Sequence, residues 1–200
     1  MTVGAELMNT FQRIAAALSA YQPSIRSETD KTQAAVAAVF HPRRDDLYLL
    51  FIERAAHPKD PWSGHIAFPG GTAEPDDSDL KYTAERETRE ELGLDLSTAQ
   101  YLGRLDDVAG ATLPIQVACF VYAIFEGVEV APNDEVRDVF WTPFAHFADS
   151  TRWQRLNLEG WRNMPAIDLL GANRPALWGL TYRMVAQLAG FVGVDLPERL

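Results

Sequence analysis

Apolar positions recur with two different periods along the chain, and they predict helices and strands in turn. Near the N-terminus the apolar residues stand three or four positions apart, at Leu7, Phe11, Ile14, Ala15 and Leu18. This spacing predicts an amphipathic helix over about residues 5–20. Short apolar stretches bounded by turn-forming residues predict strands at 34–40, 47–54, 66–68, 101–105, 117–125 and 136–141.

Turn residues and helix caps divide the rest of the chain. The polar stretch 41–46 predicts a hairpin between the first two strands, and Gly70-Gly71 predicts a tight turn. An acidic loop over 74–78 precedes a helix that should begin near Asp79 and stop at Gly93, so that a loop and helix fill about 70–93. A closing helix is expected over about 175–189.

These elements predict one α/β domain that spans residues 1–200. Strands on either side of a central helix, with helices at both ends, favour helical layers packed on a mixed sheet. The chain shows no linker or repeat, and its 200 residues suit a single core. With 47% apolar and 23% charged residues, the composition excludes a disordered chain.

Charge and cysteine usage narrow the classes of partner. A net charge of -10 would repel a nucleic-acid backbone, so nucleic acid is not expected to bind. A small phosphate-bearing substrate remains compatible, because bound metal ions invert the sign of an acidic site. Cys119 is the only cysteine, which excludes an intrachain disulfide. No apolar run approaches the ~20 residues that span a bilayer, so we expect a cytoplasmic protein without membrane contact.

Three carboxylates at helical spacing are the clearest candidate chemistry. Glu87, Glu90 and Glu91 stand at i, i+3 and i+4, so they share one face of the predicted helix and repel one another. Arg86 is four positions before Glu90 and can neutralise only part of that charge. Clustered oxygen ligands suit Mg²⁺ or Mn²⁺. The alternative is a solvated acidic helix face.

Residues around this helix could complete a phosphate site. The backbone at Gly70 and Gly71 can approach a phosphate because no side chain stands in the way. His65 lies beside these glycines and could touch a phosphate, or it could be a hydrogen-bonded structural residue. Glu135 could approach from a later loop as an acid or base, or it could be a surface carboxylate. Trp62 could stack on a base.

At these residues the sequence resembles the Nudix hydrolase family. The run from Arg86 to Leu94 fills the second half of the family's signature without a gap. The first half departs from it: Ser78 stands where a glutamate is expected, the spacing to Gly71 is one residue longer, and Thr88 replaces an aliphatic residue. The resemblance implies an α/β/α sandwich with a mixed sheet, and hydrolysis of a pyrophosphate bond that depends on a divalent metal.

Further stretches resemble the coenzyme A pyrophosphatase branch of that family. They are Gly64 to Gly71, Asp77, residues 83–88, residues 134–143 and Leu177 to Thr181. The loop over 55–64 departs from the branch, with Lys59 near the place of its usual arginine. This likeness implies coenzyme A or its esters as substrate, with Lys59, His65 and the two glycines in contact with it. ADP-ribose or another nucleoside diphosphate derivative is the alternative substrate.

The resemblance also implies roles for the charged residues. Glu87, Glu90 and Glu91 would bind Mg²⁺ or Mn²⁺, and Arg86 would orient these carboxylates. Glu90 is our first choice of general base, followed by Glu91 and Glu135. A non-catalytic ligand-binding module is the remaining alternative, but it should lack one or more of these glutamates. The expected partners are a nucleotide-type small molecule and, at most, a second copy of the chain in a homodimer.

Overall fold

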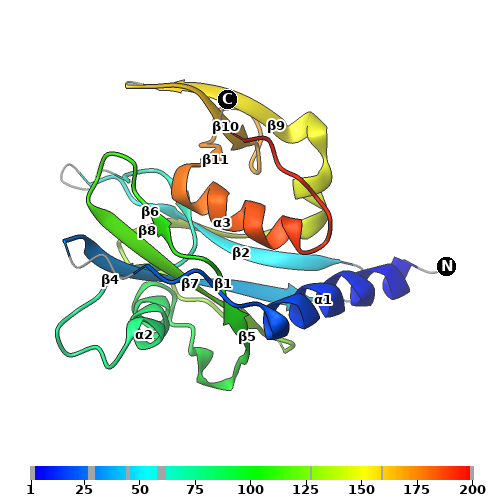
Figure 1. Cartoon of the computed structure of the whole chain (residues 1–200), viewed down its shortest axis with the longest axis horizontal. Helices are drawn as coiled ribbons and strands as arrows, with labels where there is room; N and C mark the ends of the chain where they lie inside the picture. The colour runs from blue at the N-terminus through cyan, green and yellow to red at the C-terminus, as the bar shows by residue number, and fades with distance from the viewer. Residues whose placement is uncertain are drawn as a thin grey trace.

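The computed structural model describes residues 3–26, 30–43, 46–57, 62–126, 128–158 and 160–198, which form a mixed sheet between helical layers (Figure 1). The larger sheet has the order β3-β2-β1-β7-β5, with β4 beside β1, β6 beside β7 and β8 beside β2. A smaller sheet has the order β11-β10-β9. This arrangement confirms the predicted α/β/α fold with a mixed sheet.

The helices and strands have the following bounds. The helices are α1 (Val3–Ala20), α2 (Leu80–Leu92) and α3 (Gly179–Gly190), with short 3₁₀ turns at Leu96–Thr98, Phe144–Ala148 and Ser150–Arg152. The larger sheet contains β1 (Thr32–Pro42), β2 (Leu47–Arg54), β3 (Ile66–Ala67), β4 (Gly70–Thr72), β5 (Gln100–Arg104), β6 (Val108–Ala109), β7 (Ile115–Ala123) and β8 (Val136–Pro143). The smaller sheet contains β9 (Trp153–Leu158), β10 (Trp161–Ile167) and β11 (Leu177–Trp178).

Strand β1 separates two hydrophobic cores. Successive strand residues point to opposite faces, so Ala38 and Phe40 join one core while Ala37 and Val39 join the other. The first core contains apolar residues of α1 and α3, and the second contains Ala84 and Leu92 of α2. In Figure 1, α3 and α2 accordingly lie on opposite sides of the sheet. The outer layers are thus fixed by the alternation within one central strand.

The local signals in the sequence placed α2 correctly. Asp79 caps its first turn by accepting a hydrogen bond from the Tyr82 N–H at 2.8 Å. Gly93 ends it with a φ of 64°, and its N–H donates to the Arg89 carbonyl. The predicted hairpin is also present, as the antiparallel pair β1 and β2. No helix in the described part of the chain is long and apolar enough to cross a bilayer.

Two sequence predictions were wrong, and both involve strand pairing. Gly70 and Gly71 form a strand rather than a tight turn, because β4 pairs with β1 at Val36 and Ala35. Helix α3 begins at Gly179 rather than near residue 175, because the preceding two residues form β11. Strands β9 and β10 were not predicted. The side chains of β9 are exposed or half-buried, and in β10 the buried residues are the consecutive Pro165, Ala166 and Ile167, so apolar and polar positions do not alternate along either strand.

Candidate active site

The three glutamates of α2 differ strongly in exposure. Glu91 is 1% exposed, and its Oε2 accepts a hydrogen bond from the Gly70 N–H at 2.8 Å. Arg54, at the end of β2, places Nη1 3.7 Å from the other oxygen, Oε1. Glu87 is half-buried, whereas Glu90 is exposed. One helix face therefore presents carboxylates that range from buried to exposed.

Arg86 connects this helix face to the acidic loop. Its Nε and Nη2 donate to both carboxylate oxygens of Asp77, at 2.8 and 2.9 Å. Its Nη1 donates to Glu87 and Glu90, at 3.0 Å each, and its Nη2 also donates to the Thr72 carbonyl at 3.3 Å. The residue is 8% exposed, so these bonds form in a largely dry environment. Such contacts set the orientation of the two glutamates.

Asp77 fixes the acidic loop against α2. Besides Arg86, it accepts hydrogen bonds from the Thr83 hydroxyl at 2.8 Å and the Glu74 N–H at 2.9 Å. These bonds, above all those from Arg86, hold the pKa of Asp77 well below its usual value. The hydrogen bonds that Arg86 donates to Asp77 likewise raise the pKa of Arg86, so the pair stays ionised. In the sequence, Asp77 was a candidate only through the family resemblance. Local spacing does not predict its contact with Arg86, which is nine residues away.

Uncompensated negative charge remains on the buried side of the cluster. Burial raises the pKa of Glu91 to about 8, although the Gly70 N–H and Arg54 act in the opposite direction. The charges of Glu87 and Glu135 raise it further. Burial also raises the pKa of Glu87, in spite of Arg86. Protons would be held tightly here unless another positive charge replaced them.

Glu135 belongs to the same electrostatic cluster. It lies just before β8, and its carbonyl accepts a hydrogen bond from the Ala55 N–H at 2.8 Å, which sets it beside the end of β2. Its charge contributes to the raised pKa values of both Glu87 and Glu91. A carboxylate from a distant part of the sequence thus acts on the carboxylates of α2.

The donor set suits a hard divalent cation. Carboxylate oxygens are the ligands that Mg²⁺ and Mn²⁺ prefer, and the cluster has more negative charge than Arg54 and Arg86 neutralise. As the side chains stand, no three acidic, histidine or cysteine residues of the described ranges are close enough to hold an ion together. Glu91 accepts a hydrogen bond from the Gly70 N–H, whereas Glu87 and Glu90 accept hydrogen bonds from Arg86. The residues fit a cation in kind and charge, and their side chains would have to reorient to bind it.

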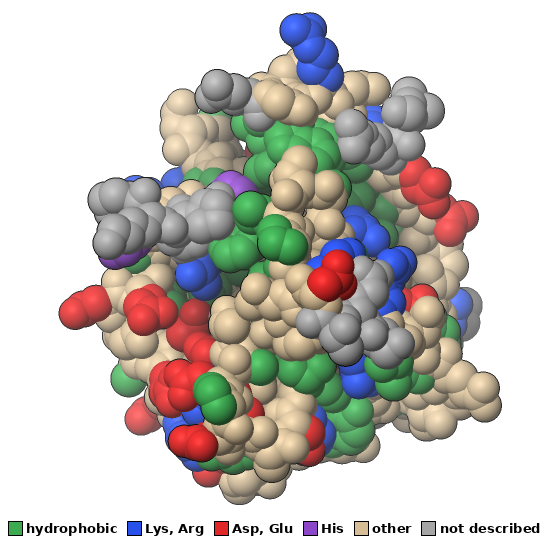
Figure 2. All heavy atoms as spheres, turned by 60° about the vertical axis from the view of Figure 1, so that its left-hand side comes forward, with side chains coloured by type: hydrophobic (Ala, Val, Ile, Leu, Met, Phe, Trp, Pro, Cys, Tyr) green, Lys and Arg blue, Asp and Glu red, His purple; other side chains and the backbone are tan. Residues whose placement is uncertain are grey.

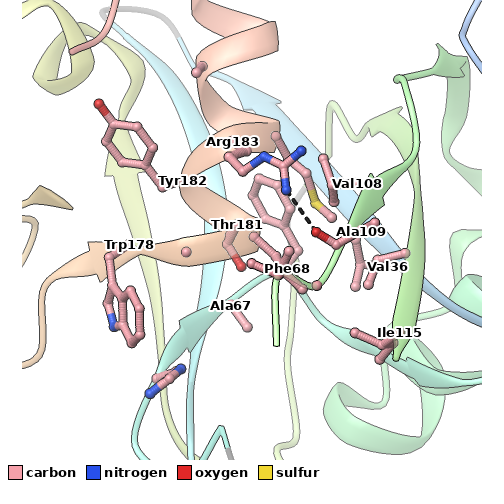
Figure 3. A pocket seen from close by; sticks show the side chains of 18 of the residues that line it. Val36, Ala67, Phe68, Val108, Ala109, Ile115, Trp178, Thr181, Tyr182 and Arg183 are labelled. Carbon is pink, nitrogen blue, oxygen red and sulfur yellow. Dashed lines mark hydrogen bonds between the residues drawn. The ribbon is translucent and has the colours of Figure 1, made fainter. Parts of the chain in front are cut away.

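A cavity of about 1360 Å³ opens beside β4. Its wall includes Gly70, Gly71 and Arg54, all of which adjoin the carboxylate cluster. In Figure 2 a group of acidic side chains gathers at the lower left, below exposed hydrophobic side chains. The close view in Figure 3 shows a largely apolar lining between Trp178 and Ile115. The carboxylate cluster thus adjoins one wall of a cavity that is lined by charged as well as apolar residues.

The structure brings most of the predicted site residues together. His65 lines the cavity with the two glycines, and its ring centroid lies 5.0 Å from that of Trp178. Lys59, which was expected to contact substrate, lies outside the described residues. The sequence did not predict a role for Arg54. In its local context Arg54 is only a charged residue at the end of an apolar strand. Thr88 is fully buried, and its hydroxyl donates to the Ala84 carbonyl, which explains how it replaces an aliphatic residue.

Comparison with known proteins gives consistent results. The model of the NUDIX domain family matches residues 31–159. The chain is 33% identical to the uncharacterized Nudix hydrolase NudL of Pectobacterium atrosepticum over 84% of this chain and 86% of that protein. It is 30% identical to a NudL protein of Salmonella heidelberg over 86% and 90% of the two chains.

Solved structures support the fold. A MutT/nudix family protein from Enterococcus faecalis matches with a TM-score of 0.53 at 17% identity, over 96% of this chain and 81% of that one. A MutT protein from Methanosarcina mazei matches with a TM-score of 0.50 at 14% identity, over 86% and 96%. At these identities the likeness concerns the fold alone.

Gly71→Ala should damage activity more than stability. An added Cβ would lie 2.6 Å from both carboxylate oxygens of Glu87, so this flexible side chain would move while the backbone stayed. We expect a melting temperature near the wild-type value and a roughly hundredfold loss of pyrophosphohydrolase activity from the misplaced carboxylate. Gly190→Ala, where an added Cβ meets nothing within 4 Å, is the matched control. If Gly71→Ala is as active as wild type, the close approach of Gly71 to the Glu87 carboxylate does not matter for activity.

The metal-free protein should lose stability as pH rises toward about 8. Glu91 has a raised pKa in the folded state, so the folded protein binds its proton more tightly than the unfolded chain does. The stabilisation is complete below the ordinary glutamate pKa and is lost as pH rises through about 8. Melting temperatures measured in chelator from pH 5 to 9 should show this decline, and Glu91→Gln should flatten it. Glu129→Gln, which removes an exposed carboxylate, is the control. If the melting temperature of Glu91→Gln falls with pH as steeply as that of wild type, Glu91 is not the group responsible.

Proposed function

Because the chain belongs to the Nudix hydrolase family, we propose that it hydrolyses the pyrophosphate bond of a nucleoside diphosphate derivative, with coenzyme A or its esters as substrate. The chain is a pyrophosphohydrolase by family. The observation that carries the proposal is the cluster of undercompensated carboxylates next to the wall of a large cavity. Gly70, Gly71 and Arg54 belong to the cavity wall and adjoin the cluster as well.

Glu87, Glu90 and Glu91 are the residues proposed to bind Mg²⁺ or Mn²⁺. A bound divalent ion supplies positive charge that offsets the charge developing on the pyrophosphate oxygens. Arg86 keeps Glu87 and Glu90 on the side of α2 that faces β4. The four residues belong to one helix, so rotation of side chains would suffice to gather the oxygens.

Glu90 is the proposed general base. It is exposed, so water can reach it, whereas Glu91 already accepts the Gly70 N–H in a buried position. A carboxylate oxygen of Glu90 would take a proton from the attacking water as the new P–O bond forms and the anhydride P–O bond breaks. Each product then carries a phosphate, and one of them contains the oxygen from water.

The cavity would hold the rest of the substrate. Its volume exceeds the 300–1,000 Å³ range common for small-molecule sites, which suits a ligand with groups on both sides of a pyrophosphate. Trp62, His65 and Trp178 contribute flat rings to its wall, and a nucleobase can stack on such surfaces. These features, together with the sequence likeness, support a nucleotide-type substrate with a long second arm.

Glu90→Gln and Glu91→Gln should each remove most turnover. Each substitution preserves size but removes a charge needed to hold the ion or accept a proton, and we expect a loss of roughly a hundredfold or more in kcat. Both variants should melt at or above the wild-type temperature in chelator, because repulsion within the cluster is relieved. Glu129→Gln should behave as wild type. Full activity in both variants would overturn the site assignment.

Coenzyme A should be cut within its pyrophosphate, giving 3',5'-ADP and 4'-phosphopantetheine. In water enriched in ¹⁸O, the heavy oxygen should enter a phosphate of one product, because water attacks phosphorus. The assay compares coenzyme A esters, ADP-ribose, dinucleoside polyphosphates and nucleoside triphosphates, with products identified by mass. If ADP-ribose or a dinucleotide has a kcat/KM roughly a hundredfold above every coenzyme A ester, about 2.7 kcal/mol, the coenzyme A proposal is wrong.

A further inference from the structure

A buried carboxylate on β2 lies next to the candidate active site, and the proposed reaction assigns it no role. Glu53 is fully buried, and the residue that follows it, Arg54, lies 3.7 Å from Glu91. Glu53 Oε1 accepts a hydrogen bond from Arg137 Nη1 at 2.8 Å, and its Oε2 accepts one from Arg174 Nη2 at 2.7 Å. A buried carboxylate that loses such a partner is strongly destabilised, so these bonds constrain the segments that supply the arginines.

One of these segments contains a β-bulge. Strand β8 pairs with β2 in regular antiparallel register as far as Asp138, which lies opposite Glu53. The next residue of β2, Arg54, lies opposite Val136, so Arg137 is an extra residue in β8. Arg137 is also the residue that bonds Glu53. The ion pair with the buried carboxylate therefore holds the bulge in place.

The bulge decides which side chains of β8 face α2. Val136 and Val139 both pack in the core on the α2 side of the sheet, although residues three apart in a regular strand face opposite sides. Without the extra residue, Arg137 would take the place of Val136 opposite Arg54, and a valine would leave the core. The chain before the bulge would also move by one residue, about 3.3 Å along the strand.

Glu135 lies immediately before the bulged part of β8. Its carbonyl accepts a hydrogen bond from the Ala55 N–H at 2.8 Å, and its N–H donates to the Asn133 side chain at 2.9 Å. The Asn133 N–H in turn donates to the Glu91 carbonyl at 2.9 Å. Glu135 is thus held between the end of β2 and the end of α2. A shift of β8 by one residue would remove it from this place.

We propose that Glu53 and Arg137 are positioning residues for the proposed reaction, because they hold the bulge that places the Glu135 carboxylate beside Glu91 as a further acidic group of the active site. The inference rests on the proposed function and deepens it. The charge of Glu135 acts on both Glu87 and Glu91, which agrees with this placement. Loss of the bond from Arg137 would displace Glu135 and leave the glutamates of α2 where they are.

Arg137→Gln tests this role, because it removes the bond that holds the bulge. The Arg137 side chain is 65% exposed, so the variant should fold, which its melting temperature checks. With Mg²⁺ and the substrate that wild type hydrolyses fastest, kcat should fall roughly tenfold while KM changes little, since the cavity wall is unchanged. Arg137→Lys, which keeps the charge, should restore part of kcat.

Arg174→Gln is the matched control. It removes the same charge and the bond to Glu53 Oε2, but it lies outside β8, so kcat should stay at the wild-type value. Glu135→Gln should itself lower kcat, and Arg137→Gln added to it should cause no further loss, because the arginine acts through that carboxylate. Wild-type kcat in Arg137→Gln, an equal loss in Arg174→Gln, or the same further loss in the Glu135→Gln background would overturn the proposal.

Hydrogen exchange of the Ala55 amide tests the positioning role apart from hydrolysis. This amide donates to the Glu135 carbonyl, so its exchange, followed by NMR in the metal-free protein, reports whether Glu135 keeps its place. The amide should exchange roughly tenfold faster in Arg137→Gln than in Arg174→Gln or wild type. If wild type hydrolyses no tested substrate, the proposed function fails and this comparison still decides the positioning role. Equal exchange rates in the two variants would overturn it.

Discussion

The guanidinium of Arg86 is the interaction on which the arrangement of the site depends. It lies within 3.3 Å of oxygens on the acidic loop, on β4 and on α2 itself. Asp77 is nearly buried, and its charge is tolerable there because this partner is present. The same group orients Glu87 and Glu90, so the loop, the strand and the helix face form one unit. The geometry of the proposed metal ligands follows from a residue that need not touch the metal.

The cluster illustrates a conflict between stability and function. Glu91 lies in a buried position that favours its neutral form, with Glu87 and Glu135 adding repulsion. A protein selected only for stability would not place these carboxylates together. A divalent cation resolves the conflict, because it offsets the repulsion and favours the ionised carboxylates. The arrangement therefore makes more physical sense for a metal-binding hydrolase than for a solvated helix face.

Features set by local chemistry could be predicted from the sequence, and features set by distant pairing could not. Asp79 and Gly93 are strong caps, and the spacing of the glutamates placed their carboxylates on one face of α2. Nothing local to Gly71 shows that it pairs with β1 and approaches Glu87. The same holds for Arg54, which reaches Glu91 only after β2 and α2 have packed. The cavity combines residues from both ends of the chain, so its lining could not be deduced from any single segment.

The central claim is that the carboxylates of α2 bind a divalent ion, and anomalous scattering from crystals grown with Mn²⁺ tests it most directly. We predict an anomalous peak at coordination distance, roughly 2.0–2.3 Å, from carboxylate oxygens of Glu87, Glu90 or Glu91. Arg86 should retain its bonds to Asp77 while its contacts to Glu87 and Glu90 lengthen. Hydrolysis of a substrate in those crystals, with no manganese peak beside these glutamates, would contradict the account.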